Sequence, residues 1–193
     1  MSGWVLPPLN NTHIPMPIWN DTDTPLAYLI TVRTYGTWLH GDERGSVDRF
    51  MNKFGSPRIP RRDARHEYNR SIMKGEPVLL DAARRLAVED AIKEVCVHRD
   101  WRLLSVNVRT NHFHAVSVTP NLRPSRALNA FKAYATRKMR DRHLWDSNRT
   151  PWADKGSERW LWNENSVANA CHYVLHGQGC DLQEFDAMEA LGK

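Results

Sequence analysis

Two short strand-like runs, joined by a two-residue turn, lie in the middle of the sequence and limit the folds it can adopt. Every second side chain is apolar in residues 104–109, and residues 112–119 form another strand-like run. Thr110-Asn111 separates the two runs. Because alternation with a period of two is typical of a half-buried strand, the sequence predicts a tight β-hairpin in the middle of the chain.

An amphipathic helix is predicted on each side of this hairpin. Asp81 can cap a helix that ends near His98, and Ser125, which follows a proline, can cap a helix that ends near Arg142. Each helix carries an apolar stripe at helical spacing, which indicates packing on a sheet. The stripes consist of Val88, Ile92 and Val95 in the first helix and of Leu128, Phe131 and Ala135 in the second.

Two further strands and a last helix complete the pattern. Residues 26–34 are rich in β-branched and aromatic side chains and predict a buried first strand. The aromatic residues 159–162 predict a short fourth strand, and residues 166–176 predict a helix that Gly177 ends. Between the first strand and the first amphipathic helix, we expect a long loop with one helix near residues 63–73.

The predicted order of elements is β-α-β-β-α-β, followed by one more helix. This order is that of the α+β, ferredoxin-like arrangement, in which an antiparallel sheet carries two helices on one face. The other face of the sheet is then free for a functional site.

We expect one compact domain with a segment at either end. A chain of 193 residues, 41% of them hydrophobic, is long enough for one domain with a core. Residues 1–25 are rich in proline and predict an extended arm. Residues 26–180 would form the domain, and residues 181–193, with a net charge of −3, an acidic tail.

Composition excludes several classes of protein. No run approaches the roughly 20 apolar residues that span a membrane, and no basic segment followed by an apolar run opens the chain. We therefore expect a cytoplasmic protein without a membrane partner. The three cysteines, at 96, 171 and 180, form no Cys-x-x-Cys pair, which argues against a disulfide framework and against a thiolate zinc site.

Positive charge is concentrated in one part of the chain. The whole sequence carries a net charge of +5, whereas residues 101–142 contain nine basic residues and one acidic residue, a local net of +8. A basic segment interleaved with aromatic residues is typical of proteins that bind a phosphodiester backbone. A solvated basic surface without a ligand is the alternative.

A His-x-His pair lies in the second strand of the predicted hairpin. Side chains two positions apart on a strand share a face, so the imidazoles of His112 and His114 converge while Phe113 turns toward the helices. Two neutral imidazoles in this position can bind a divalent cation. We expect both histidines to face the surface and to contribute little to stability.

A tyrosine with polar neighbours lies near the end of the last predicted helix. His176, three residues after Tyr173, shares its helix face. Gln178, five residues after it, reaches that face only if the helix loosens at Gly177. Either side chain is a candidate third ligand for a cation held by the histidine pair.

Taken together, these residues resemble the single-tyrosine HUH nucleases, specifically the transposase family that includes the REP-associated tyrosine transposases. The resemblance covers about residues 26–180. It rests on residues 29–33 as the first strand, on Asn111-His112-Phe113-His114, and on Tyr173-Val174 in a helix after the fourth strand. Family members usually have a glutamine or another polar residue four positions after the tyrosine, where this chain has Gly177. Gln178 is therefore the first choice for the third ligand and His176 the second.

The resemblance implies a nuclease and strand transferase that acts on single-stranded or hairpin DNA. Tyr173 would attack a phosphodiester and form a 5′-phosphotyrosine, with Mg²⁺ or Mn²⁺ at the histidine pair. Trp38 and Trp145 are candidates for stacking on unpaired bases. The basic helix would lie near the DNA and contact phosphates through Arg126, Lys132, Arg137, Lys138 and Arg140.

Several alternatives remain open at this point. A protein that binds DNA or RNA hairpins without cutting them could have the same fold. A hydrolase that uses water would need a carboxylate base near the histidines, for which Glu164 is the nearest candidate. Tyr134, on the basic helix, is the rival nucleophile. Monomers and homodimers are both compatible with the sequence.

Overall fold

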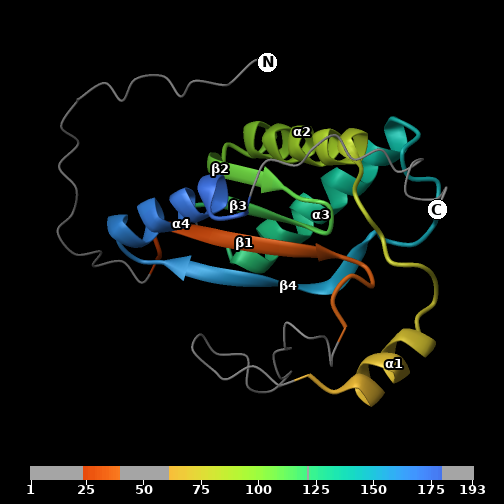
Figure 1. Cartoon of the computed structure of the whole chain (residues 1–193). Coiled ribbons are helices and arrows are strands. Elements are labelled where there is room, and N and C mark those ends of the chain that lie inside the picture. The colour runs from red at the N-terminus through yellow and green to blue at the C-terminus, as the bar shows by residue number, and fades with distance from the viewer. Residues whose placement is uncertain (1–23, 40–60, 121, 180–193) are drawn as a thin grey trace, which may run out of the picture.

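Four antiparallel strands form a single sheet with helices on both faces (Figure 1). The computed structural model describes residues 24–39, 61–120 and 122–179. The strands are β1 (Ala27–Thr34), β2 (Arg102–Val108), β3 (His112–Val118) and β4 (Trp152–Leu161), in the spatial order β2-β3-β1-β4. The helices are α1 (Asp63–Ser71), α2 (Ala82–His98), α3 (Pro124–Asp141) and α4 (Glu164–His176). The ferredoxin-like prediction is thereby confirmed.

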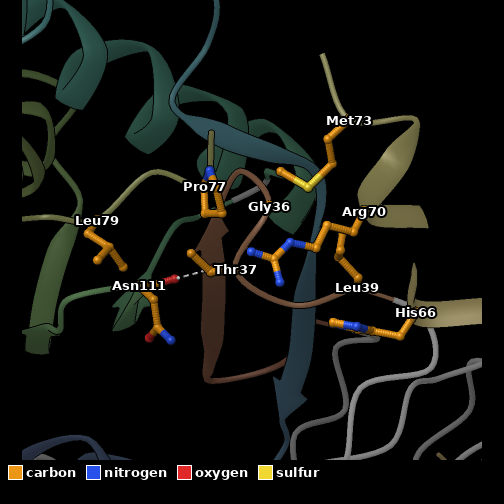
Figure 2. A pocket seen from close by; sticks show the side chains of 9 residues that line it. All are labelled: Gly36, Thr37, Leu39, His66, Arg70, Met73, Pro77, Leu79 and Asn111. Carbon is orange, nitrogen blue, oxygen red and sulfur yellow. Dashed lines mark hydrogen bonds between the residues drawn. The ribbon is translucent and has the colours of Figure 1, made fainter. Parts of the chain in front are cut away.

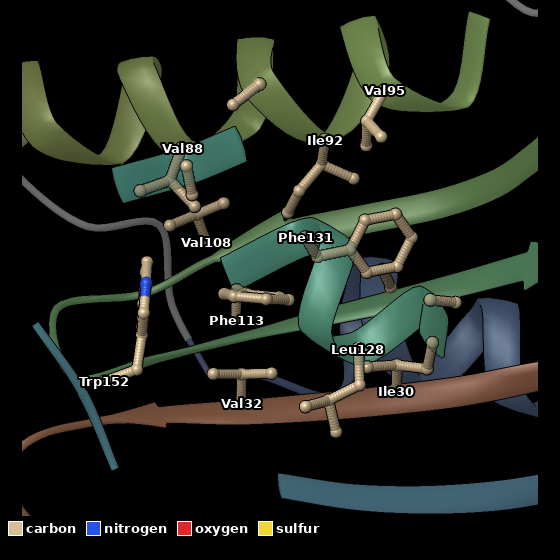
Figure 3. Close-up of a cluster of buried hydrophobic side chains, with 14 of the residues drawn as sticks. Ile30, Val32, Val88, Ile92, Val95, Val108, Phe113, Leu128, Phe131 and Trp152 are labelled. Carbon is tan, nitrogen blue, oxygen red and sulfur yellow. The ribbon is translucent and has the colours of Figure 1, made fainter. Parts of the chain in front are cut away.

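Helices α2 and α3 cover one face of the sheet and enclose the main core (Figure 3). Phe113 lies at its centre, with its ring edge-on to Trp152 at 5.4 Å and to Phe131 at 6.4 Å between centroids. Edge-to-face aromatic pairs stabilise a core beyond the area they bury. The apolar stripes of α2 and α3 meet these rings, as the helical spacing predicts.

The other face of the sheet is covered at one end by α4 (Figure 1). Ala170 and Val174 of this helix pack on Leu29, Val116 and Leu161 from three strands. Asn107 of β2 donates a hydrogen bond from Nδ2 to the carbonyl oxygen of Val174, at 3.0 Å. This contact fastens the last turn of α4 to the sheet.

The predicted helix start is right for α2 and two residues late for α3 and α4. Asp81 caps α2 by accepting a hydrogen bond from the backbone N–H of Arg84, at 2.8 Å. The cap predicted at Ser125 is wrong, because α3 begins at Pro124 and Ser125 is already inside the helix. Proline suits this first helical position, because the N–H it lacks would have no partner within the helix and its φ angle is preset for the first turn. Helix α4 begins at Glu164, capped by Asn163.

Strand β4 is longer than the sequence predicts. Its first half contains Asp154-Lys155-Gly156, residues that strands usually disfavour, and it pairs along its length with β1. A register shift interrupts this pairing beside residues 153–155, where the Lys132 ammonium donates to the carbonyl oxygens of Ala153 and Asp154, at 2.7 and 2.9 Å. Pairing with β1 and the lysine contact therefore outweigh the low strand propensity of this segment.

The predicted proline-rich arm, apart from its last two residues, and the acidic tail lie outside the described residues. Within the described part, Cys96 and Cys171 are free thiols, and burial raises the pKa of Cys96 to about 12. Across residues 24–39, 61–120 and 122–179, no helix combines the length and the apolar character needed to cross a membrane.

Candidate active site

The two histidines of the His-x-His pair lie side by side on the face of the sheet that α4 partly covers. Their ring centroids are 4.7 Å apart. Phe113, between them in sequence, points into the core under α2 and α3. The alternation predicted for this strand is thus confirmed, and both imidazoles lie on the face opposite those two helices.

His114 is buried, contrary to the expectation that both histidines face the surface. Its side chain is 7% exposed because α4 covers this part of the strand. Its Nδ1 shares a hydrogen bond of 2.7 Å with the hydroxyl of Thr31 on β1. Burial, with smaller contributions from the charges of His112 and Arg33, lowers the pKa of His114 to about 4, against an opposing hydrogen bond from Gln178. The imidazole is therefore neutral near pH 7, as a metal ligand must be.

His112 is oriented by its neighbour in the turn of the hairpin. Its Nδ1 lies 2.7 Å from Oδ1 of Asn111. Because a carboxamide oxygen only accepts hydrogen bonds, Nδ1 donates this one, and Nε2 presents a lone pair in the neutral imidazole.

The side-chain amide of Gln178 faces that lone pair. Its Nε2 donates a hydrogen bond to the carbonyl oxygen of Tyr173, at 3.2 Å, so its Oε1 points to Nε2 of His112, at 3.3 Å. Two acceptor atoms therefore face each other, an arrangement that a shared proton or a cation stabilises. Imidazole nitrogen and amide oxygen also form a donor set that suits Mn²⁺ or Mg²⁺.

Tyr173 projects from the last turn of α4 beside the histidines. Its ring is edge-on to His114, with centroids 5.5 Å apart, and its side chain is 46% exposed. A Cβ at Gly177 would lie only 2.7 Å from Cδ2 of this ring. The glycine, which stands where the family usually has a polar residue, gives the tyrosine ring room to adopt this orientation.

Of the two candidates for the third ligand, the structure brings Gln178 to the histidine pair and leaves His176 away from it. His176 is exposed and packs against His172 one turn earlier, with ring centroids 5.0 Å apart. Glu164 begins α4, nine residues and therefore about 14 Å along the helix from Tyr173. In the described part of the chain, no three His, Cys, Asp or Glu side chains are grouped as a metal site.

The basic helix α3 lies on the opposite face of the sheet from the histidine pair. Four of its five predicted phosphate contacts are engaged within the protein. Lys132 donates to the carbonyl oxygens of β4, and Lys138 forms an ion pair with Glu94. Arg140 donates to the carbonyl oxygen of Ser147, at 3.0 Å, and the Arg137 guanidinium lies over the Tyr134 ring. Arg126, Arg137 and Arg140 are nevertheless exposed to solvent.

The rival nucleophile, Tyr134, is on this helix as well. Its ring lies near His98 of α2, at 6.2 Å between centroids, and beneath the Arg137 guanidinium, at 4.3 Å. Because the sheet separates it from His112 and His114, it does not join the histidine cluster.

Three residues near the histidines were not identified as site residues from the sequence. Thr31 hydrogen-bonds His114, Arg33 is paired in register with His112, and Asn107 fastens α4. Positions 31 and 33 are two residues apart on β1, so the sequence pattern could have assigned both side chains to one face of the sheet. Which residue of β3 each one meets depends on strand pairing, which the pattern does not contain.

The candidate stacking residues are both held by contacts within the protein. The guanidinium of Arg33 lies over the Trp38 ring, 3.3 Å from its centroid. Trp145 donates a hydrogen bond from Nε1 to the carbonyl oxygen of Arg149, at 2.9 Å. Stacking of either ring on a DNA base stays a prediction.

Comparisons with known proteins identify the family. The model of the family described as "Transposase IS200 like" matches residues 67–174, more than half of the chain. A solved REP-associated tyrosine transposase bound to a REP hairpin is similar at a TM-score of 0.46 and 11% identity, over 82% of this chain and 70% of that one. A putative transposase from Deinococcus radiodurans R1 gives a TM-score of 0.41 and 11% identity, over 86% and 100%. No curated protein matches. On the family match, the chain belongs to the IS200-like transposases.

Proposed function

We propose that this transposase is a metal-dependent endonuclease and strand transferase for single-stranded or hairpin DNA, acting through a covalent 5′-phosphotyrosine at Tyr173. The single observation that carries the proposal is the meeting of four side chains from two distant segments of the sequence, residues 112–114 and 173–178. Two imidazoles, an amide oxygen and a half-exposed tyrosine lie within contact of one another at the edge of α4.

In the first step, the Tyr173 hydroxyl oxygen attacks phosphorus and the bond from phosphorus to the 3′ oxygen breaks. The tyrosine loses its proton, the leaving oxygen gains one to become a free 3′-hydroxyl, and the 5′ phosphate stays on the tyrosine. In the second step, the 3′-hydroxyl of another DNA end attacks the phosphotyrosine and regenerates the tyrosine. The ester conserves the bond energy that rejoining needs, which hydrolysis would lose.

The divalent cation would be held by His112, His114 and Gln178. When bound, it supplies positive charge that polarises the scissile phosphate and offsets the negative charge developing on it. The protein's own part is to keep the ligands ready: Asn111 and Thr31 each engage a Nδ1 atom, and burial keeps His114 neutral.

The DNA would be attracted by basic residues on both faces of the sheet. Arg33 lies beside the histidines, and Arg126, Arg137 and Arg140 of α3 are the exposed candidates on the other face. Charge of this kind gives affinity without sequence preference, so the target is chosen by other contacts.

The decisive experiment is to incubate the protein with labelled single-stranded DNA and Mn²⁺ and to look for an adduct that survives denaturing electrophoresis. We expect a covalent adduct that EDTA prevents, with the modified peptide identified as that of Tyr173 by mass spectrometry. DNA binding without any adduct on single-stranded or hairpin substrates would instead support the alternative of a non-catalytic hairpin-binding protein.

A further inference from the structure

A pocket of about 330 Å³ lies between α1 and the end of β1, next to the turn that carries Asn111 (Figure 2). This volume is at the lower end of the range typical of small-molecule sites, about 300 to 1,000 Å³. The residues that line it are Gly36, Thr37, Leu39, His66, Arg70, Met73, Pro77, Leu79 and Asn111.

One wall of the pocket is firmly attached to the sheet. The Tyr35 hydroxyl accepts a hydrogen bond from the backbone N–H of Lys74, at 2.9 Å, and the Tyr35 carbonyl accepts one from Val78, also at 2.9 Å. Arg149 donates a third, at 2.7 Å, to the Lys74 carbonyl oxygen. Gly36 has a φ of +74°, a left-handed conformation that residues with a side chain rarely adopt. This wall is therefore preformed.

The lining combines apolar surface with positive charge. Leu39, Met73, Pro77 and Leu79 provide the apolar part, and none of the nine lining residues is acidic. Figure 2 shows the Arg70 guanidinium and the His66 ring, both from α1, directed toward the space in front of Thr37 and Asn111. An apolar surface beside a guanidinium suits a ligand with a flat, weakly polar ring and an adjacent phosphate.

Asn111 connects this pocket to the candidate active site. Its carbonyl oxygen accepts hydrogen bonds from the backbone N–H and the hydroxyl of Thr34, at 2.9 and 3.0 Å. Its side chain accepts the hydrogen bond from His112. A DNA strand whose phosphate lies at His112 thus has the pocket as its immediate neighbour.

We infer that the pocket binds one unpaired nucleotide of the DNA strand, adjoining the phosphate that Tyr173 attacks. The base lies against Met73, Pro77 and Leu79, and its phosphate lies beside Arg70. This inference rests on the proposed function, because it takes the ligand to be the DNA strand at the histidine site.

The test compares two single-stranded probes by fluorescence polarisation in EDTA, where no cleavage occurs. One probe is oligothymidylate of about 16 nucleotides, which forms no hairpin, and the other is an equally long strand of abasic units. The variants are the double substitution Met73→Ala and Leu79→Ala, the single substitutions Arg70→Ala and Arg70→Lys, and Arg65→Ala. Arg65 is an exposed arginine of α1 outside the pocket and serves as the matched control for charge.

We expect the double variant to lower the preference for oligothymidylate over the abasic strand about five-fold or more, since one stacked base contributes at least that much. Arg70→Ala should weaken binding of both probes, clearly more than Arg65→Ala does, and Arg70→Lys should restore part of the loss. Circular dichroism of each variant checks the fold, and Leu79, being 43% exposed, tolerates truncation.

If the double variant keeps the wild-type preference for oligothymidylate over the abasic strand, the pocket does not bind a base. If Arg70→Ala and Arg65→Ala weaken binding equally, the pocket does not bind a phosphate through Arg70. Either result overturns the inference. The wild-type adduct assay with Mn²⁺ is run separately. If the wild type forms an adduct but the double variant keeps the preference for oligothymidylate, only the nucleotide pocket is refuted. If the double variant loses that preference but the wild type forms no adduct, only the proposed chemistry is refuted.

Discussion

The two faces of the sheet are built from the same strands and differ in how completely they are covered. On the face under α2 and α3, the side chains of β1 and β3 are apolar and close-packed around Phe113. On the α4 face, paired positions change along the strands from apolar to polar: Leu29 faces Val116, Thr31 faces His114, and Arg33 faces His112. The covered face is apolar, and the partly covered face carries the polar side chains of the proposed active site.

The polar end of the α4 face shows how such groups are made compatible with a folded protein. A buried polar atom costs stability unless it is hydrogen-bonded. His114 satisfies this requirement through Thr31, and His112 does so through Asn111. Helix α4 ends where the apolar residues end, so Tyr173 lies at the boundary between the apolar and the polar half.

The largest expected effect is on catalysis, from Tyr173→Phe. This substitution removes the proposed nucleophile and keeps the ring, so adduct formation should fall by on the order of 10⁴-fold or more. The affinities for Mn²⁺ and DNA should hardly change. The matched control is Tyr134→Phe on the other side of the sheet, which should leave the adduct intact. Loss of the adduct in the control only would assign the chemistry to the α3 side.

The next largest effect is on stability. It is measured at two consecutive residues of β3 whose side chains point to opposite faces of the sheet. Phe113→Ala should lower the free energy of unfolding by about 3 to 5 kcal/mol, because it leaves a cavity in the core. His114→Ala should cost about 1 kcal/mol, mainly the hydrogen bond to Thr31. Urea denaturation measures both. Equal losses would mean that the α4 face contributes as much to the core as the α2 and α3 face does.

A smaller effect is expected on metal affinity, from the residues that orient the imidazoles. Asn111→Ala and Thr31→Val should each weaken Mn²⁺ binding by about 10- to 100-fold, the usual range for partners of a metal ligand. Calorimetry measures this, with Asn129→Ala, an exposed change on α3, as control. Unchanged affinity in both Asn111→Ala and Thr31→Val would show that the cation is not held by these imidazoles.

The smallest effect concerns which face contacts the DNA backbone. The logarithm of the affinity for a single strand falls with the logarithm of salt concentration by about 0.7 per neutralised phosphate. Replacing Arg126, Arg137 and Arg140 by glutamine should therefore reduce the slope by up to about 2 in total. A slope unaffected by these changes would leave the α4 face as the contact surface, with Arg33→Gln as the informative variant.

Much of the architecture could be predicted from periodicity alone. The hairpin, the amphipathic helices α2 and α3, and the opposite directions of Phe113 and the two histidines all follow from repeats of 2 or 3.6 residues, which are properties of neighbouring residues in one element. Strand β4 was predicted too short, because its first half has little strand propensity and is held by pairing with β1.

Local sequence periodicity places His112 and His114 on one face of a strand, and it allows Gln178 to reach the helix face of Tyr173 only if the helix loosens at Gly177. Three further facts depend on tertiary packing: Gln178 meets His112, 66 residues away in sequence; Thr31 lies against His114; and Tyr134 is on the far side of the sheet. It also buried His114, which the strand pattern alone places at the surface. The physical reason is that a local pattern assigns a side chain to a face, whereas the packing of α4 across the sheet decides which part of that face is covered and which distant residues meet there.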